Sequence, residues 1–273
     1  MILKPIFPFP SLHLNLFAAF ALLGSSLSFG EIVLVSHDFG GLNTDTLNGK
    51  TATVFSTDIT SAGGSSTWVA SNDFNADGTM SGGGSDAARL HLGSYINDSM
   101  GSATGKFSLT ATLNPSAGGG GTDFLSLGYF TGPIGLGDDF ASDSNKYAIG
   151  TAITRRSSTG ISEYYAGPRT DNSFNPINGV GTRTYTIDFD FTPASGYDEI
   201  SNFGTITFHS DNDGGSSTSY ILNSAKDIQY IGITRDDDVA GIFSDLEFTQ
   251  IPEPSSLFLL IIAGMGLAIW RRR

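Results

Sequence analysis

The 273-residue chain contains no cysteine, and this absence limits both its chemistry and its means of stabilisation. Thiol catalysis, iron–sulfur clusters and cysteine-ligated zinc are excluded, and no disulfide can cross-link the fold. Basic residues are scarce as well, because 14 Lys and Arg stand against 27 Asp and Glu and give a net charge of −13. Nucleic-acid binding needs a basic face, so this balance argues against a nucleic-acid partner. An acidic surface instead suits solubility outside the cell and attracts divalent cations.

The central part of the chain also lacks heptads and helical hydrophobic periodicity. Apolar residues alternate with polar ones instead, most clearly over 107–113 and 185–191, and this period of two predicts half-buried strands. Ile242, Leu246 and Phe248 share one parity and are predicted to face the same side of a further strand. The remaining expected strands are Ile32–Phe39, Ala52–Ile59, Phe124–Phe130, Tyr147–Thr154, Ile161–Ala166, Gly204–Ser210, Tyr220–Leu222 and Ile228–Thr234.

About a dozen short strands between glycine-rich breaks predict an all-β chain. Their spacing favours an antiparallel jelly-roll β-sandwich, in which two curved sheets pack face to face. A β-helix is the alternative, although the chain has no fixed short repeat. The region from Trp68 to Gly78 and the strand pair Lys106–Leu113 and Asp123–Phe130 loosely resemble concanavalin-like and laminin-G-like sandwiches. The sequence thus predicts one β-sandwich domain over residues 31–250.

The first 30 residues predict a secretory signal peptide. Lys4 precedes an apolar stretch from Leu12 to Leu23. Ser28 and Gly30 are the small residues that cleavage before Glu31 requires. A second transmembrane helix is the alternative, but the apolar stretch has only about half of the ~20 residues that a span needs.

The chain ends with a short polar signature, an apolar stretch and a basic cluster. These three parts are Pro252, Glu253 and Pro254, then residues 257–270, and finally Arg271, Arg272 and Arg273. As a helix, the 14 residues of the apolar stretch would extend roughly 21 Å at ~1.5 Å per residue, which is short for a bilayer core of ~30 Å. The three arginines are expected to stay cytoplasmic, so the preceding residues face away from the cytoplasm.

This arrangement resembles the tripartite PEP-CTERM sorting signal of exopolysaccharide-making Gram-negative bacteria, and we assign residues 251–273 to it. The resemblance covers the signature, the apolar helix with Gly264 and Gly266, and the terminal arginines. It implies cleavage near the signature by an exosortase, a membrane-embedded processing enzyme with a Cys-type active site. It also implies a transient stage in the inner membrane before the cell envelope or extracellular matrix is reached. An ordinary C-terminal anchor that is never cut is the alternative.

A candidate calcium site follows Trp68. Oxygen-bearing side chains at alternate positions before a glycine are typical of the first half of an EF-hand-like loop. The twelfth position is Gly84 instead of Glu, and Asp86 is the substitute. An Asx-rich turn that binds its own backbone is the alternative. The predicted ligands are Asp73, Asn75, Asp77, the Thr79 carbonyl and Asp86. Weaker cation candidates are the runs Asp211–Gly214 and Asp236–Asp238.

Catalytic patterns are sparse. Asp188 and Asp190 lie two apart on one expected strand and project from one face, ~7 Å apart, a separation that glycosidases use. Their apolar neighbours occupy the opposite face, so the alternative is that both carboxylates face water. His37, His91 and His209 are isolated in the sequence and form no zinc or triad spacing. Three aromatic residues are candidates for stacking on sugar rings, and a position in the hydrophobic core is the alternative for each. They are Trp68, Tyr164 and Tyr165.

These observations favour a non-enzymatic exported protein with a structural, adhesive or glycan-binding β-sandwich. Its expected partners are the exosortase and exopolysaccharide or other glycans. One alternative is a carbohydrate-active enzyme, a glycoside hydrolase or lyase, on a concanavalin-like fold. A calcium-dependent lectin module is the other alternative.

Processing of the tail can be tested directly. We expect mass spectrometry of the mature protein to find no peptide that contains Trp270, because cleavage near Glu253 releases the chain from its anchor. Replacing Glu253 is expected to leave the uncut protein in the inner membrane without altering the fold. Recovery of intact Arg271–Arg273 from most of the mature wild-type protein would show that the tail is a plain anchor.

Overall fold

The computed structural model describes most of one compact unit of the chain, Glu31–Glu253. The described residues are 31–40, 44–81, 84–101, 106–115, 124–130, 132–133, 135–136, 148–157, 160–166, 172–175, 182–190, 204–211, 218–222, 228–236 and 241–251. The expected signal peptide and the tail from residue 252 lie outside them. Within the described part of the chain, no helix is both long enough and apolar enough to cross a membrane.

The described strands form two sheets, and every pairing between them is antiparallel. The first sheet has the order β13 (Thr218–Leu222), β12 (Gly204–Ser210), β11 (Arg183–Asp190), β6 (Lys106–Pro115), β15 (Gly241–Ile251), β1 (Ile32–His37), β2 (Val54–Phe55), with β4 (Thr79–Met80) also paired to β15. The second sheet has the order β10 (Asn172–Asn175), β9 (Gly160–Ala166), β8 (Ala148–Ser157), β7 (Phe124–Phe130), β14 (Tyr230–Asp236), β5 (Asp86–His91), β3 (Ser65–Ala70). We call them the eight-stranded and the seven-stranded sheet.

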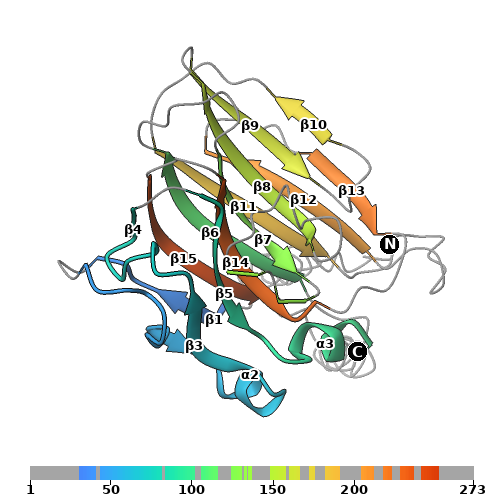
Figure 1. The fold of residues 1–273 in the computed structure, drawn as a ribbon. Coiled ribbons are helices and arrows are strands. Elements are labelled where there is room, and N and C mark those ends of the chain that lie inside the picture. The colour runs from blue at the N-terminus through green and yellow to red at the C-terminus, as the bar shows by residue number, and fades with distance from the viewer. Residues whose placement is uncertain are drawn as a thin grey trace, which may run out of the picture. The chain divides into compact units, whose positions relative to one another are not determined.

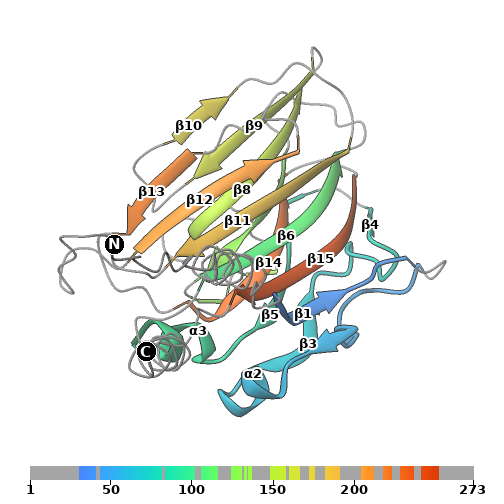
Figure 2. The same ribbon diagram turned by 180° about the vertical axis from the view of Figure 1, so that it is seen from behind.

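The two sheets form the two layers of a sandwich, seen from opposite sides in Figures 1 and 2. Strand β6 alternates between buried and half-buried residues from Phe107 onward, and β11 does the same from Tyr185 onward. The buried sets of both strands face the other sheet, as the period of two predicted. The predicted all-β antiparallel sandwich is therefore confirmed.

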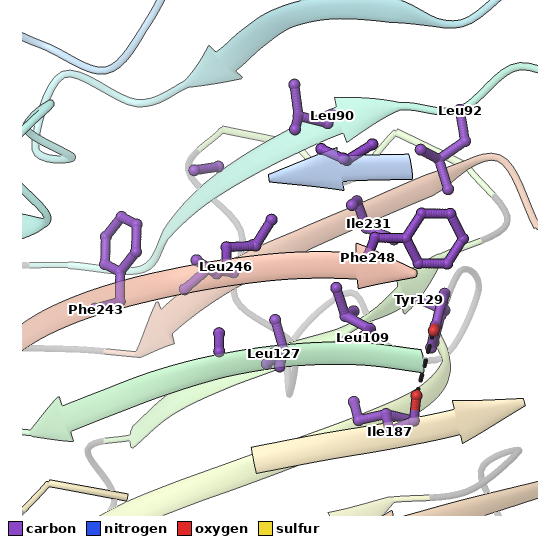
Figure 3. Packing of buried hydrophobic residues seen from close by; sticks show 14 of the residues in the cluster. Leu90, Leu92, Leu109, Leu127, Tyr129, Ile187, Ile231, Phe243, Leu246 and Phe248 are labelled. Atoms are coloured by element: carbon purple, nitrogen blue, oxygen red, sulfur yellow. Dashed lines mark hydrogen bonds between the residues drawn. The ribbon is translucent and has the colours of Figure 1, made fainter. Parts of the chain in front are cut away.

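Aromatic and aliphatic side chains from both sheets fill the space between the layers (Figure 3). Tyr129 of β7 packs edge-on against Phe189 of β11, with 4.7 Å between ring centroids. Its hydroxyl donates across the core to the Ile187 carbonyl at 3.3 Å. Burial raises the pKa of the Tyr129 hydroxyl well above its ordinary value, and the Asp188 carboxylate raises it further. The hydroxyl therefore stays protonated and satisfies its own polarity inside an apolar core.

The predicted parity of β15 is wrong at its start. Ile242 is 44% exposed, whereas its neighbour Phe243 is fully buried together with Leu246 and Phe248. The register between β15 and β6 shifts between Ser244 and Glu247, and Asp245 adopts a φ of 55° there. This β-bulge inserts one extra residue, so the inward-facing parity changes along the strand.

The expected strand Ala52–Ile59 is also corrected. Only β2 (Val54–Phe55) is extended, and the short helix α2 (Thr57–Ser61) follows it. The Ser56 side chain caps this helix by accepting from the Asp58 N–H at 3.1 Å. A hydroxyl that binds the backbone two residues on offers an alternative to the sheet ladder, so local polar chemistry ends the strand.

A second short helix, α3 (Tyr95–Gly101), follows β5, although the sequence predicted no helix in this region. Ile96 is buried in the core, and the Tyr95 hydroxyl donates to Gln250 Oε1 of β15 at 2.8 Å. These contacts hold α3 against the end of the sandwich.

One segment closes an edge of the sandwich by pairing with both sheets. Phe55 of β2 pairs with Val35 of β1 in the eight-stranded sheet. A few residues earlier, the Ala52 N–H donates to the Ser66 carbonyl of β3, the edge strand of the seven-stranded sheet, at 2.8 Å. This closure satisfies backbone groups that would otherwise line an open edge.

The turn before β4 touches β15 through a glycine. Gly78 has a φ of 81°, and its carbonyl accepts from the Phe243 N–H at 3.0 Å. A Cβ atom added to Gly78 would lie 2.1 Å from the Phe243 carbonyl oxygen. Both the backbone conformation and the close approach therefore require glycine.

Gly49 and Gly78 allow the effect of the left-handed backbone to be measured apart from the effect of the close contact. Gly49 has the same φ of 81°, but nothing lies within 4 Å of an added Cβ atom. Gly49→Ala is expected to cost about 1–2 kcal/mol for the left-handed backbone alone. Gly78→Ala is expected to cost about 1–3 kcal/mol more, because β15 must shift. Urea denaturation of both variants checks this, and equal losses would show that the contact with Phe243 is unimportant.

Candidate functional site

The predicted calcium ligands divide into two groups, and the first is engaged in a turn. Asp77 Oδ1 accepts from the Thr79 N–H at 2.9 Å and from the Thr79 hydroxyl at 2.6 Å. Asn75 Nδ2 donates to the same hydroxyl at 3.0 Å, and the Thr79 carbonyl accepts from the Asn75 N–H at 2.9 Å. The groups that were expected to converge on a cation therefore bind one another, as in the Asx-turn alternative.

The second group binds an arginine. Arg235 of β14 is fully buried, and its register partner on β5 is Asp86. Arg235 Nε donates to Asp86 Oδ2 at 2.7 Å, and Nη2 contacts the same oxygen. Nη2 also donates to Asp73 Oδ2 at 3.2 Å. Both carboxylates thus neutralise a buried guanidinium, a group that is costly to bury without such partners.

The sequence interpretation missed Arg235. It lies at the end of the expected strand Ile228–Thr234, next to the acidic run that begins at Asp236. A lone basic residue in an apolar strand is the one signal that pointed to a buried ion pair. Nothing in the spacing identified its partners, because Asp86 and Asp73 are 149 and 162 residues away.

Within the described ranges, no three His, Asp or Glu residues come together as a group that could hold a metal ion. Asp211 is an exposed turn residue that follows β12, and its N–H donates to the Thr184 carbonyl at 3.0 Å. The other residues of that run lie outside the described residues, as do Asp237 and Asp238. Calcium binding by this chain stays a prediction, and the local geometry favours the turn.

Asp188 and Asp190 lie on the outer face of β11, as predicted, and bind different partners. Asp188 Oδ2 is 3.1 Å from His209 Nε2 of β12, and Asp190 Oδ2 is 2.8 Å from Lys106 Nζ of β6. All four side chains are roughly one-third to one-half exposed. The two carboxylates therefore belong to two separate cross-strand pairs, with Lys106 and with His209.

Threonine pairs continue this outer face. The hydroxyl groups of Thr110 and Thr186 are hydrogen-bonded, with 3.1 Å between their oxygens, and those of Thr112 and Thr184 are hydrogen-bonded at the same distance of 3.1 Å. Each pair links β6 to β11, whose register places these residues opposite each other. The outer face of the eight-stranded sheet thus presents paired hydroxyls and carboxylates bound to Lys106 and His209 across β6, β11 and β12, and we call it the hydroxyl face.

Trp68 and His37 belong to the core. Trp68 is fully buried, and its ring centroid lies 5.6 Å from that of His37. Burial lowers the pKa of His37, and the nearby Asp38 carboxylate opposes this effect. His37 also packs edge-on against Phe39 at 4.3 Å. Trp68 is therefore not a surface platform for sugars; the side chains of Tyr164 and Tyr165 lie outside the described ones.

The turn can be tested against calcium. Asp77→Ala removes two hydrogen bonds to Thr79 and is expected to cost about 1–2 kcal/mol. We expect the same loss of melting temperature in calcium and in chelator, because these bonds stabilise the turn without a metal. A calcium-dependent rise in the wild-type melting temperature that Asp77→Ala abolishes would establish the calcium site, since a cation that binds only the folded loop stabilises it.

Solved structures that are similar to this chain include sandwich proteins of several kinds. An endo-1,3-β-glucanase from Streptomyces sioyaensis is 12% identical, with 82% of this chain and 98% of that chain covered and a TM-score of 0.44. The metal-free carbohydrate recognition domain of Emp46p is 12% identical, with coverages of 67% and 87% and a TM-score of 0.40. The carbohydrate-binding module CBM66 from Bacillus subtilis is 11% identical, with coverages of 67% and 90% and a TM-score of 0.33.

No curated protein matches the sequence. The family comparison gives one result, at the end of the chain. Residues 250–273 match the PEP-CTERM protein-sorting motif, which contains the signature at Glu253 and the terminal arginines. The tail of this chain is therefore a PEP-CTERM sorting motif.

Proposed function

We propose that this chain is an exported protein of the cell envelope or extracellular matrix, with a structural, adhesive or glycan-binding β-sandwich. The observation that carries the proposal is the sorting motif at residues 250–273. The sandwich of residues 31–251 precedes the sorting motif. This order fits an exported domain that carries a cleavable sorting signal. Exosortase is the processing partner, and the inner membrane is a transient location.

The hydroxyl face supports a binding or structural role for the sandwich. It exposes hydroxyls and charged groups held in fixed cross-strand positions by β6, β11 and β12. Glycans are rich in hydroxyl groups, and ordered donors and acceptors of this kind suit them. Thr110, Thr112, Thr184 and Thr186 use only part of their hydrogen-bonding capacity in their mutual pairs. Polysaccharide is therefore the partner we propose.

A carbohydrate-active enzyme is the second candidate, and Asp188 with Asp190 is the pair that favours it. The two carboxylates project from one face at the ~7 Å spacing of alternate strand residues. Each is bound to its own basic partner, His209 or Lys106, at 3.1 and 2.8 Å. These separate pairs favour a non-catalytic role, because a general acid and a nucleophile or base must face one substrate together.

Binding and turnover distinguish the two candidates. The protein in the form that cells export is applied to a glycan array, with and without calcium, and incubated with the polysaccharides that it binds. We expect binding without release of shorter products, and the same result for Asp188→Asn. Robust depolymerisation that Asp188→Asn abolishes would establish the enzyme instead. Absence of binding to every glycan would leave a purely structural role for the sandwich.

A further inference from the structure

Arg89 lies on the outer face of the seven-stranded sheet, away from the hydroxyl face. Its neighbours Ala88 and Leu90 are buried in the core, so the Arg89 side chain projects from the opposite side of β5. Its register partners are Val69 of β3 and Gly232 of β14. Val69 is 41% exposed. Arg89 therefore stands between a partly exposed apolar side chain and a strand position that has no side chain.

The charge of Arg89 is not neutralised within the described structure. Lys50, Lys106 and Arg235 each bind an aspartate carboxylate there. Among the described residues, Arg89 forms no ion pair, and its Nη1 is buried without a hydrogen-bond acceptor. A partly buried charge that lacks a counter-charge is costly, and an anion bound to the accessible part of this half-buried guanidinium would reduce that cost. This unpaired cation occurs in a chain of net charge −13.

Two rings accompany the guanidinium. Arg89 Cζ lies 6.0 Å from the centroid of the Tyr230 ring. His91, two residues along β5, lies 4.7 Å from the same ring with an interplanar angle of 32°. All three side chains are half-buried. Burial lowers the pKa of Arg89, while Tyr230 opposes the effect, and burial also lowers the pKa of His91.

The row of the sheet that runs from Arg89 across β14 and β7 has no side chains on those two strands. Gly232 of β14 pairs with Gly128 of β7, and both follow Arg89 in the same row of the sheet. A Cβ atom on Gly232 would lie 2.4 Å from the Ala88 carbonyl oxygen, so glycine is required there. Both glycines are buried, and the backbones of β5 and β14 pack closely at this point, so this row gives the guanidinium no side-chain partner.

We infer that Arg89, His91 and Tyr230 form a binding site for a carboxylate-bearing sugar unit of a polysaccharide. The inference rests on the proposed function, because that function places the protein among extracellular glycans. The guanidinium fork matches a carboxylate in a bidentate manner. The rings of Tyr230 and His91 supply apolar surface with a hydroxyl and a ring nitrogen at its edge. A neutral sugar would leave the charge of Arg89 without an anion, so this charge selects an acidic glycan.

The test compares acidic and neutral polysaccharides. Affinities of the exported protein for a uronate-containing polysaccharide and for a neutral glucan are measured by calorimetry. Arg89→Gln is expected to weaken binding of the acidic polysaccharide by about tenfold to a hundredfold, the range for a hydrogen bond to a charged group. Arg89→Lys keeps the charge and loses the fork, so we expect an intermediate loss. Arg183→Gln removes the same charge from β11 on the other sheet and is the control, expected to bind as the wild type does.

The outcomes separate this site from the broader proposal. Normal binding of the acidic polysaccharide by Arg89→Gln, or equal affinity of the wild type for both polymers, overturns the site but leaves glycan binding intact. No binding of either polymer by the wild type overturns both. If Arg89→Gln melts several degrees lower than the wild type, a competition assay with free sugars on the wild-type protein replaces the test with this variant. Free glucuronate is then expected to displace the acidic polysaccharide from the wild type where glucose does not, and equal displacement overturns the site.

Discussion

A buried charge fixes one end of this sandwich. The Arg235 guanidinium is fully enclosed, so it requires partners that stay in place. Asp86 supplies one on the adjacent strand, and Asp73 supplies another from the turn that precedes β4. The same turn binds the opposite sheet, because Gly78 accepts from the Phe243 N–H and β4 pairs with β15. One short loop is thereby held to both layers, and removing either aspartate weakens the compensation of a charge that cannot reach water.

The same constraint explains why a metal-like sequence has another use here. Alternate oxygen ligands followed by glycine are typical of calcium loops, but they also suit any tight turn that must satisfy its own backbone. In this chain Asp77 stabilises the turn, and Asp73 and Asp86 neutralise arginine. An arginine is a permanent cation, so its interaction with Asp73 and Asp86 does not depend on the calcium concentration. Stability without cysteine thus comes from burial, sheet hydrogen bonds and this internal ion pair.

The sequence predicted well those features that depend on residues near one another in the chain. The alternation along β6 and β11 gave the strands, their inward faces and the outward position of Asp188, because side-chain direction in a strand has a fixed period of two. The prediction failed where one residue changes that period, as at the bulge near Asp245, or where a single hydroxyl caps a helix, as at Ser56. Neither event has a strong signal in composition.

Contacts between segments far apart in the chain could not be predicted from the sequence. Arg235 and Asp86 are paired across 149 residues, and only the strand order brings them together. The proposed site has the same origin, because β14 places Tyr230 opposite His91 of β5. In contrast, the sorting motif is contiguous, and the sequence alone located it. The sorting motif and the fold class could therefore be predicted from the sequence. The side chains that meet on one face of a sheet could not.

We propose that the sorting motif delivers the sandwich out of the cell and that glycans then retain it there. The most direct measurement is the distribution of the chain among inner membrane, polysaccharide matrix and medium, in cells with and without polysaccharide synthesis. The account predicts that the shortened protein is recovered with the matrix in the first case and moves to the medium in the second. An uncut protein that stays in the inner membrane in both, or a distribution that ignores the polysaccharide, would contradict it.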